Sequence, residues 1–158
     1  MTDQKEEVKN WYDGFTFGNL TDIYNPWSII NFLDTGKFQT YWANTSSNHL
    51  ADELIQQGSK DIKTDFENLL RGKPIETQLD EQIIYEQLNE RESAIWSLFL
   101  ASGYLKVIKT EFFMQSGRTI YTLSLTNREV RIMFENMIHG WFADYDSGYN
   151  DFIRALLQ

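Results

Sequence analysis

The sequence YLKVIKTEFFMQSGRTIYTLSL, residues 104–125, predicts a β-hairpin. Its two halves, residues 104–113 and 118–125, are rich in the aromatic and β-branched residues that favour strands. Gln115, Ser116 and Gly117 lie between the halves, and these residue types favour a tight turn. The patterns on both sides of the hairpin have a helical period instead.

Three helices are expected around the hairpin. Residues 79–88 and 91–102 place apolar side chains at helical spacing, and Gly103 ends the second run. After the hairpin, Thr126 followed by Glu129 three residues later predicts a capping box at the start of another helix. Helix, helix, hairpin and helix is the element order of a winged helix-turn-helix variant. We therefore expect a winged-helix-like module over residues 75–142.

The first half of the chain predicts a helical segment after an extended start. Residues 11–17 alternate aromatic residues with glycine, a pattern typical of extended chain or a turn rather than helix. Asn25-Pro26 predicts a helix start, and Gly36 predicts the end of that helix. Two further helices are expected, one from the polar residues 44–47 toward Gly58 and one over residues 61–70.

The composition excludes several classes of protein. The 158 residues are 42% hydrophobic, enough for one domain or two small ones with a packed core. Without cysteine there is no thiol nucleophile, thiolate metal site or disulfide, and a cytoplasmic location is the default expectation. The hydrophobic runs are too short to cross a bilayer, so no membrane partner is expected. The net charge of −9 opposes nonspecific binding to nucleic acid.

Motifs of the common catalytic sites are absent from the sequence. It contains no GxxxxGK followed by Ser or Thr, no GxGxxG, no HExxH and no GxSxG. The two histidines, His49 and His139, are far apart in the sequence and do not form a metal-binding pattern. We interpret the acidic residues near Glu76 and near Asp146 as solvated surface rather than as a metal or catalytic site. The sequence therefore predicts no catalytic residue and no metal site.

Basic residues concentrate around the predicted hairpin and give the stretch 103–131 a local net charge of +3. A basic hairpin with aromatic residues, next to a helix-turn-helix pattern, is where such a fold would contact nucleic acid. The alternative is an ordinary fluctuation of charge, with the aromatic residues forming the core of the hairpin. The candidate nucleic-acid contacts are Lys106, Lys109, Arg118, Arg128 and Arg131.

Five segments together resemble successive landmarks of a bacterial AAA-ATPase-like family, whose members commonly continue into a PD-(D/E)xK-type nuclease domain. The segments are WYDGFTFG (11–18), YNPWSIINFL (24–33), GKFQTYWANTSSN (36–48), IWSLFLASGYL (95–105) and LSLTNREVRIMFENMI (123–138). The resemblance spans nearly the whole chain and implies the region that follows the nucleotide-binding core. The P-loop of the family would lie upstream and the nuclease motif downstream, so the chain looks truncated relative to that family.

The resemblance also implies which residues face a nucleotide. The lid or nucleotide-facing candidates are Trp11, Tyr12, Asp13, Gly14, Tyr41, Trp42 and Thr45. Other landmark positions are Tyr24, Asn25, Pro26, Trp27, Gly103, Tyr104, Asn127, Glu129 and Val130. Each landmark also has a structural interpretation, in which the glycines form turns or caps and Trp27, Trp42 and Trp96 anchor the core. Both interpretations stay open at this point.

We therefore expect a mainly α fold with a small β-hairpin. It comprises a helical lid-like segment over residues 1–74, the winged-helix-like module over residues 75–142, and a linker with the start of a nuclease-like region over residues 143–158. The expected function is non-catalytic, a lid and interaction module that couples a nucleotide-binding core to a nuclease-like domain or partner. ATP and magnesium are implied only for full-length relatives, and no cofactor is expected in this chain. The alternative is a winged helix that binds nucleic acid weakly.

Overall fold

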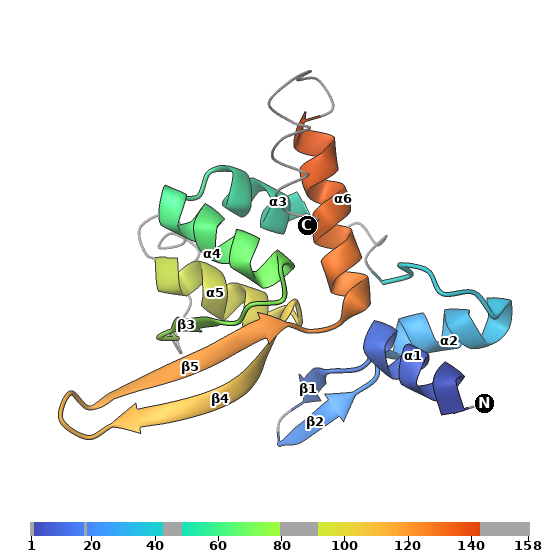
Figure 1. The fold of residues 1–158 in the computed structure, drawn as a ribbon, viewed down its shortest axis with the longest axis horizontal. Coiled ribbons are helices and arrows are strands. Elements are labelled where there is room, and N and C mark those ends of the chain that lie inside the picture. The colour runs from blue at the N-terminus through green and yellow to red at the C-terminus, as the bar shows by residue number, and fades with distance from the viewer. Residues whose placement is uncertain (1, 18, 43–48, 80–91, 143–158) are drawn as a thin grey trace.

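The computed structural model describes residues 2–17, 19–42, 49–79 and 92–142, and Figure 1 shows its fold. These residues are mainly helical with two small antiparallel sheets, which confirms the predicted fold class at this level. The predictions for residues 80–91 and 143–158 lie outside the described residues. In chain order the elements are α1 (Thr2–Tyr12), β1 (Phe15–Phe17), β2 (Leu20–Ile23), α2 (Pro26–Thr35), α3 (His49–Gln56), α4 (Lys60–Leu70), β3 (Ile75–Thr77), α5 (Glu92–Ala101), β4 (Leu105–Phe113), β5 (Arg118–Leu125) and α6 (Arg128–Phe142).

The predicted hairpin is confirmed as β4 and β5, which project together from the body of the protein (Figure 1). Their register runs from Leu105 opposite Leu125 to Phe113 opposite Arg118. The register shifts between residues 107 and 109, which marks a β-bulge at Ile108. Most of β4 is exposed, because only the base of the hairpin reaches the core.

A third strand, β3, joins this sheet and was not predicted. Ile75 pairs with Leu123, so the strand order is β3-β5-β4 and β4 lies at the edge. The strand has only three residues and directly follows Pro74. Its pairing with β5 stabilises it, and such a contact between distant residues leaves little signal in the local sequence.

The predicted helix boundaries in the first half are confirmed for α2. The Asn25 side chain accepts a hydrogen bond from the Ser28 amide at 3.1 Å, as an N-cap residue does. Gly36 ends the helix in the left-handed conformation, with its amide donating to the Phe32 carbonyl. The helices predicted to end near Gly58, over residues 61–70 and over residues 91–102 are present as α3, α4 and α5.

The start of the chain corrects the prediction for residues 11–17. Trp11 and Tyr12 form the last turn of α1, and the strand in this segment, β1, covers Phe15–Phe17. The preceding residues include glutamate, glutamine and lysine, which favour helix and propagate it into the aromatic pair. Gly14, with φ of 96°, then separates the helix from the strand.

The predicted capping box at Thr126 is also wrong. Asn127 caps α6, because its Oδ1 accepts a hydrogen bond from the Val130 amide at 3.1 Å. Thr126 instead donates through Oγ1 to the Gly103 carbonyl at 2.6 Å. Glu129 does not turn back to its own helix start, because contacts with the N-terminal part of the chain engage its carboxylate.

The main hydrophobic core lies between α3, α4, α5, α6 and the base of the three-stranded sheet. At its centre, the Phe134 ring lies 4.9 Å from Phe66, 6.0 Å from Phe99 and 5.5 Å from Tyr104 between centroids. Residues on both sides of position 74, the expected boundary between the two segments, contribute to this one core.

The expected role of the tryptophans as core anchors holds for Trp96, which is buried in the main core. Trp42 is half-buried, and its ring lies 5.4 Å from Phe15 and 5.5 Å from Tyr104. Trp27 is 56% exposed, so its prediction as a core anchor is wrong. The reason is that α2 turns Ser28 and Phe32 inward, which leaves Trp27 on its outer side.

Candidate functional site

Three consecutive residues at the start of α6 bind the N-terminal part of the chain, and we call Asn127, Arg128 and Glu129 the α6 clasp. Asn127 donates through Nδ2 to the Asp13 carbonyl at 2.9 Å. Arg128 pairs with Glu7 through Nη1 at 2.5 Å. Glu129 accepts from another element, α2. The clasp therefore fixes the N-terminal segment against the core.

Glu129 is the most buried member of the α6 clasp, with an exposed fraction of 0%. Its Oε1 accepts a hydrogen bond from Ser28 Oγ at 2.7 Å, and its Oε2 accepts one from the Trp42 amide at 2.8 Å. One carboxylate thereby joins α6 to α2 and to the segment after it. The sequence gives no signal for this role, because the capping-box pattern explains Glu129 locally.

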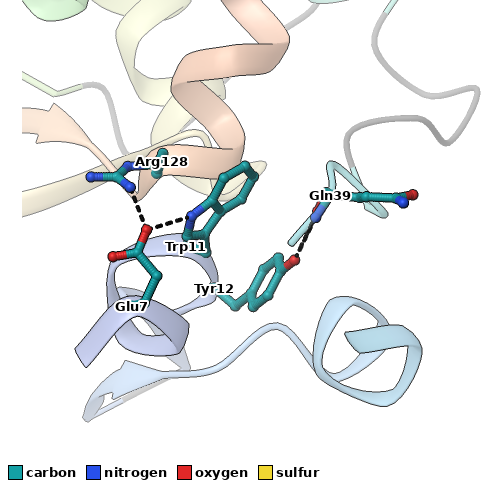
Figure 2. Close-up of polar contacts among 5 residues, drawn as sticks. All are labelled: Glu7, Trp11, Tyr12, Gln39 and Arg128. Atoms are coloured by element: carbon teal, nitrogen blue, oxygen red, sulfur yellow. Dashed lines mark hydrogen bonds and ion pairs between the residues drawn. The ribbon is translucent and has the colours of Figure 1, made fainter. Parts of the chain in front are cut away.

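Figure 2 shows how α1 meets α6. Glu7 and Trp11 lie one helical turn apart on α1, and Trp11 donates through Nε1 to Glu7 Oε1 at 3.1 Å. The same oxygen pairs with Arg128, whose guanidinium carbon lies 6.0 Å from the Trp11 ring centroid. Trp11 therefore contacts Glu7 through its ring nitrogen and lies near the guanidinium of Arg128.

Tyr12 is fully buried. Figure 2 shows its hydroxyl directed at the backbone of Gln39. Its hydroxyl donates to the Gln39 carbonyl at 2.9 Å and accepts from the Gln39 amide at 3.0 Å. Burial raises the pKa of Tyr12 to about 12, although the bond to the Gln39 backbone acts in the opposite direction. This phenol stays protonated at neutral pH and acts as a structural bridge.

The remaining nucleotide-facing candidates that the structure describes lie in different parts of it and do not form one site. Tyr41 donates to the Lys37 carbonyl at 2.7 Å, and Trp42 packs against the aromatic rings described above. Asp13 and Gly14 instead line a polar pocket on another part of the surface. Thr45 lies outside the described residues.

The polar pocket has a volume of about 500 Å³ and lies between α1, the base of the hairpin and the start of α6. We call it the cationic pocket, because its lining includes four cationic side chains against the two carboxylates of Asp13 and Asp22. The cations are Lys9, Lys106, Arg128 and Arg131. The pocket thus brings together members of two candidate sets, Asp13 with Gly14 and three of the five proposed nucleic-acid contacts.

Asp13 is the unusual group in this pocket. The residue is only 6% exposed, and its Oδ1 has no hydrogen-bond partner among the described residues. A buried acceptor without a donor costs about 1–3 kcal/mol. Gly14, next to it, has no space for a side chain, since a Cβ atom would lie 2.5 Å from the Thr126 carbonyl oxygen.

The other two nucleic-acid candidates lie further along the hairpin, outside the cationic pocket. Lys109 pairs with Glu111 at 3.6 Å on the exposed strand β4. Arg118 begins β5 opposite Phe113, at the tip of the hairpin. The five cations therefore divide between a recessed pocket and a projecting hairpin.

A second, apolar pocket of about 950 Å³ lies between α2, β1 and the base of β4. Trp27 and Ile30 of α2 line it, together with Trp42 and Val107. Leu33 follows one turn after Ile30, and we call Trp27, Ile30 and Leu33 the α2 apolar face. Their exposed fractions are 56%, 65% and 75%. The sequence predicted this apolar spacing but not that the face would be left uncovered.

The described ranges contain no cluster of three or more His, Asp and Glu side chains able to hold a metal ion. Within the same ranges, no helix combines the length and apolar character that a membrane crossing requires. Comparisons of the chain with protein-family models, curated proteins and solved structures give no match.

Proposed function

We propose that this chain is a non-catalytic lid and interaction module of an AAA-ATPase-like assembly. In this proposal it couples a nucleotide-binding core to a nuclease-like domain or partner, as the sequence resemblance implies. The observation that carries the proposal is the exposed α2 apolar face, beside a large apolar pocket. Clusters of large apolar side chains exposed to water are typical of protein-binding surfaces.

The α2 apolar face has the chemistry of an interaction hot spot. Trp27, Ile30 and Leu33 are spaced three residues apart, which places them along one side of the helix. Burying a large apolar side chain stabilises a complex by about 1.5–3 kcal/mol, and tryptophan is enriched among hot-spot residues. Ser28 and Phe32 hold the opposite side of α2 in the protein, so the face is presented on a fixed helix.

We further propose a winged-helix-like module, expected from the sequence over residues 75–142, that here begins earlier, with α4, and includes β3, α5 and the β4–β5 hairpin. Support comes from the strand order β3-β5-β4, in which the short strand after the first helix joins the hairpin. In this arrangement α5 takes the position of the recognition helix.

The character of α5 favours a protein partner over duplex nucleic acid. The helix reads ESAIWSLFLA and contains no basic residue. Ala94, Ile95, Trp96 and Phe99 are all buried in the main core. A recognition helix needs polar and basic side chains directed into the major groove, and α5 directs apolar side chains into the protein instead.

The proposal is tested by binding to the P-loop-containing core of an AAA-ATPase-like protein from the same genome, produced separately. Calorimetry should detect a complex with the wild-type chain. The double variant Trp27→Asp/Ile30→Asp should weaken it at least about 30-fold, the loss expected for a single hot spot of about 2 kcal/mol. Met114→Asp is the matched control, because Met114 is an exposed apolar residue at the hairpin tip.

Near-UV circular dichroism should show that both variants are folded, since the substituted side chains are exposed. Absence of a complex, or equal affinity of the Trp27→Asp/Ile30→Asp and wild-type chains, would overturn the proposal. Micromolar binding of ATP with magnesium by this chain alone would contradict its non-catalytic role.

A second candidate function, weak nucleic-acid binding, is favoured by the exposed hairpin. Phe112 and Phe113 are exposed beside Lys109 and Arg118, and aromatic and basic side chains together suit stacking and phosphate contact. Binding to an oligonucleotide at low salt should weaken when Lys109 and Arg118 are changed to Glu. No binding of single-stranded or duplex oligonucleotides at low salt would exclude this function.

A further inference from the structure

We propose that two copies of this chain form a symmetric dimer by pairing their β4 strands in antiparallel, edge to edge, with Thr110 of one copy opposite Thr110 of the other. The outer edge of β4 is separate from the α2 apolar face, so the inference does not depend on the proposed function. It rests on the open edge of the sheet, on the order of charges along β4 and on the exposed apolar residues beside them.

The outer edge of β4 is open among the described residues. The strand order β3-β5-β4 leaves β4 bonded to β5 on one side only, and the hairpin projects from the body of the protein (Figure 1). The backbone N–H and C=O groups on the free side of an edge strand are a template for another strand. Residues 109–113 pair without interruption with residues 118–122 of β5, so this part of β4 has the regular geometry that a further strand requires.

The order of charges along β4 favours a second copy of the same strand. In a symmetric antiparallel pair, the register is defined by the residue that lies opposite itself on the two-fold axis. With Thr110 on the axis, Lys109 of each copy lies opposite Glu111 of the other. An axis one residue earlier or later places two lysines or two glutamates opposite each other, and like charges in these positions destabilise a sheet. The strand therefore complements itself when Thr110 lies on the axis.

The charges that would meet are already held on one side of the strand. Lys109 and Glu111 pair with each other at 3.6 Å, and both side chains are exposed. In the dimer the two ion pairs lie side by side, so that four charges of alternating sign surround the axis. The segment 107–113 contains no other charged residue, so the two copies meet along strands of zero net charge although the whole chain has a net charge of −9.

Apolar residues beside these charges would be covered in the same register. Ile108 lies opposite Phe112 of the other copy, and their exposed fractions in the single chain are 57% and 60%. Burial of apolar surface is the main favourable contribution to most protein association. The β-bulge at Ile108 interrupts the ladder, so the pairing does not continue toward the base of the hairpin. A pairing this short predicts a dimer of micromolar rather than nanomolar affinity.

Sedimentation equilibrium tests the dimer, and near-UV circular dichroism shows that each variant is folded. The wild-type chain should be in monomer–dimer equilibrium at micromolar concentrations. Lys109→Glu and Glu111→Lys should each weaken the dimer at least about tenfold, because each variant places like charges opposite one another twice. An equimolar mixture of the two variants should restore it, since every lysine then lies opposite a glutamate. Arg71→Glu, which reverses one charge of the ion pair with Glu67 at the end of α4, is the control and should dimerise like wild type.

The absence of native cysteine allows a single introduced thiol to test the register. A disulfide requires Cα atoms within about 7 Å, so with oxidised glutathione Thr110→Cys should form a linked dimer at least about tenfold faster than Ser116→Cys at the exposed hairpin turn. A monomer at millimolar concentration would overturn the proposal and leave this edge to a strand of another protein. A dimer that survives both charge reversals, as one formed by the α2 apolar face would, or equal cross-linking at positions 110 and 116, would also overturn it.

Discussion

Replacing Glu129 with alanine should be among the most destabilising single changes in this protein. The substitution removes the acceptor of the buried hydrogen bond from Ser28 Oγ at 2.7 Å and that of the partly buried bond from the Trp42 amide at 2.8 Å; the Trp42 amide keeps only its longer bond to Ser28 Oγ at 3.3 Å. Each donor left buried without an acceptor costs about 1–3 kcal/mol. The Ser28 hydroxyl without its acceptor and the weakened Trp42 bond together predict a loss of about 3 kcal/mol in the free energy of unfolding.

Glutamine at the same position should be much milder. Its amide oxygen can accept from the Trp42 amide while its Nε2 donates to Ser28 Oγ, so only the contribution of the charge is lost. We expect Glu129→Gln to cost about 1–2 kcal/mol. The order of stability is therefore wild type, then Glu129→Gln, then Glu129→Ala.

Urea unfolding, followed by tryptophan fluorescence, measures these differences at neutral pH. A loss of about 3 kcal/mol also corresponds to a melting temperature lowered by roughly 6–12 °C for a chain of this size. Glu135→Ala is the control on the same helix. Its surface ion pair with Arg131 predicts a cost below about 1 kcal/mol. If Glu129→Ala and Glu135→Ala unfold at the same urea concentration, Glu129 does not hold the N-terminal segment in the way described.

Two further predictions concern the segment that contacts α6. Gly14→Ala should destabilise the protein by about 2–3 kcal/mol, because the new Cβ atom would collide with the Thr126 carbonyl oxygen. The control Gly117→Ala has open space around the new Cβ atom and should cost about 1 kcal/mol. Urea unfolding of the two variants measures the difference. Burial raises the pKa of the folded Tyr12 phenol above its ordinary value of 10, so the component of an absorbance titration that Tyr12→Phe removes should have a pKa of about 12. The contribution of the protonated phenol to the free energy of unfolding should be complete below pH 10 and should decline toward pH 12. A Tyr12 component that titrates near pH 10 would contradict the burial of this hydroxyl.

Local signals in the sequence predicted most of the regular elements. Asn25-Pro26 and Gly36 act through their own backbone and side-chain chemistry, so the ends of α2 follow from a few neighbouring residues. The hairpin likewise follows from strand-forming runs on either side of a turn that contains Gly117. These features need no knowledge of the rest of the chain.

The errors occurred where distant residues decide the structure. Thr126 and Glu129 have the spacing of a capping box, but Gly103 engages the Thr126 hydroxyl and Ser28 engages the Glu129 carboxylate. Trp27 has the residue type of a core anchor, yet the side of α2 that faces the protein is set by Ser28 and its partner on α6. A local pattern cannot report such contacts, since their partners lie far along the sequence.

The candidate sites show the same division. The sequence identified Lys106, Arg128 and Arg131 as one basic group and Asp13 as part of a separate group, and only the fold places all four around one pocket. The charge count could predict that the hairpin region is basic. It could not predict that a buried carboxylate would lie among the cations.

The α6 clasp also has a consequence for the order in which the protein folds. Its bonds to Asp13, Glu7 and Ser28 span 114, 121 and 101 positions of the sequence. Contacts between such distant residues form slowly, because a long loop must close first. During synthesis from the N-terminus, α1 and α2 emerge long before residues 127–129 have been added. The N-terminal segment is therefore synthesised first, but its bonds to the α6 clasp form last.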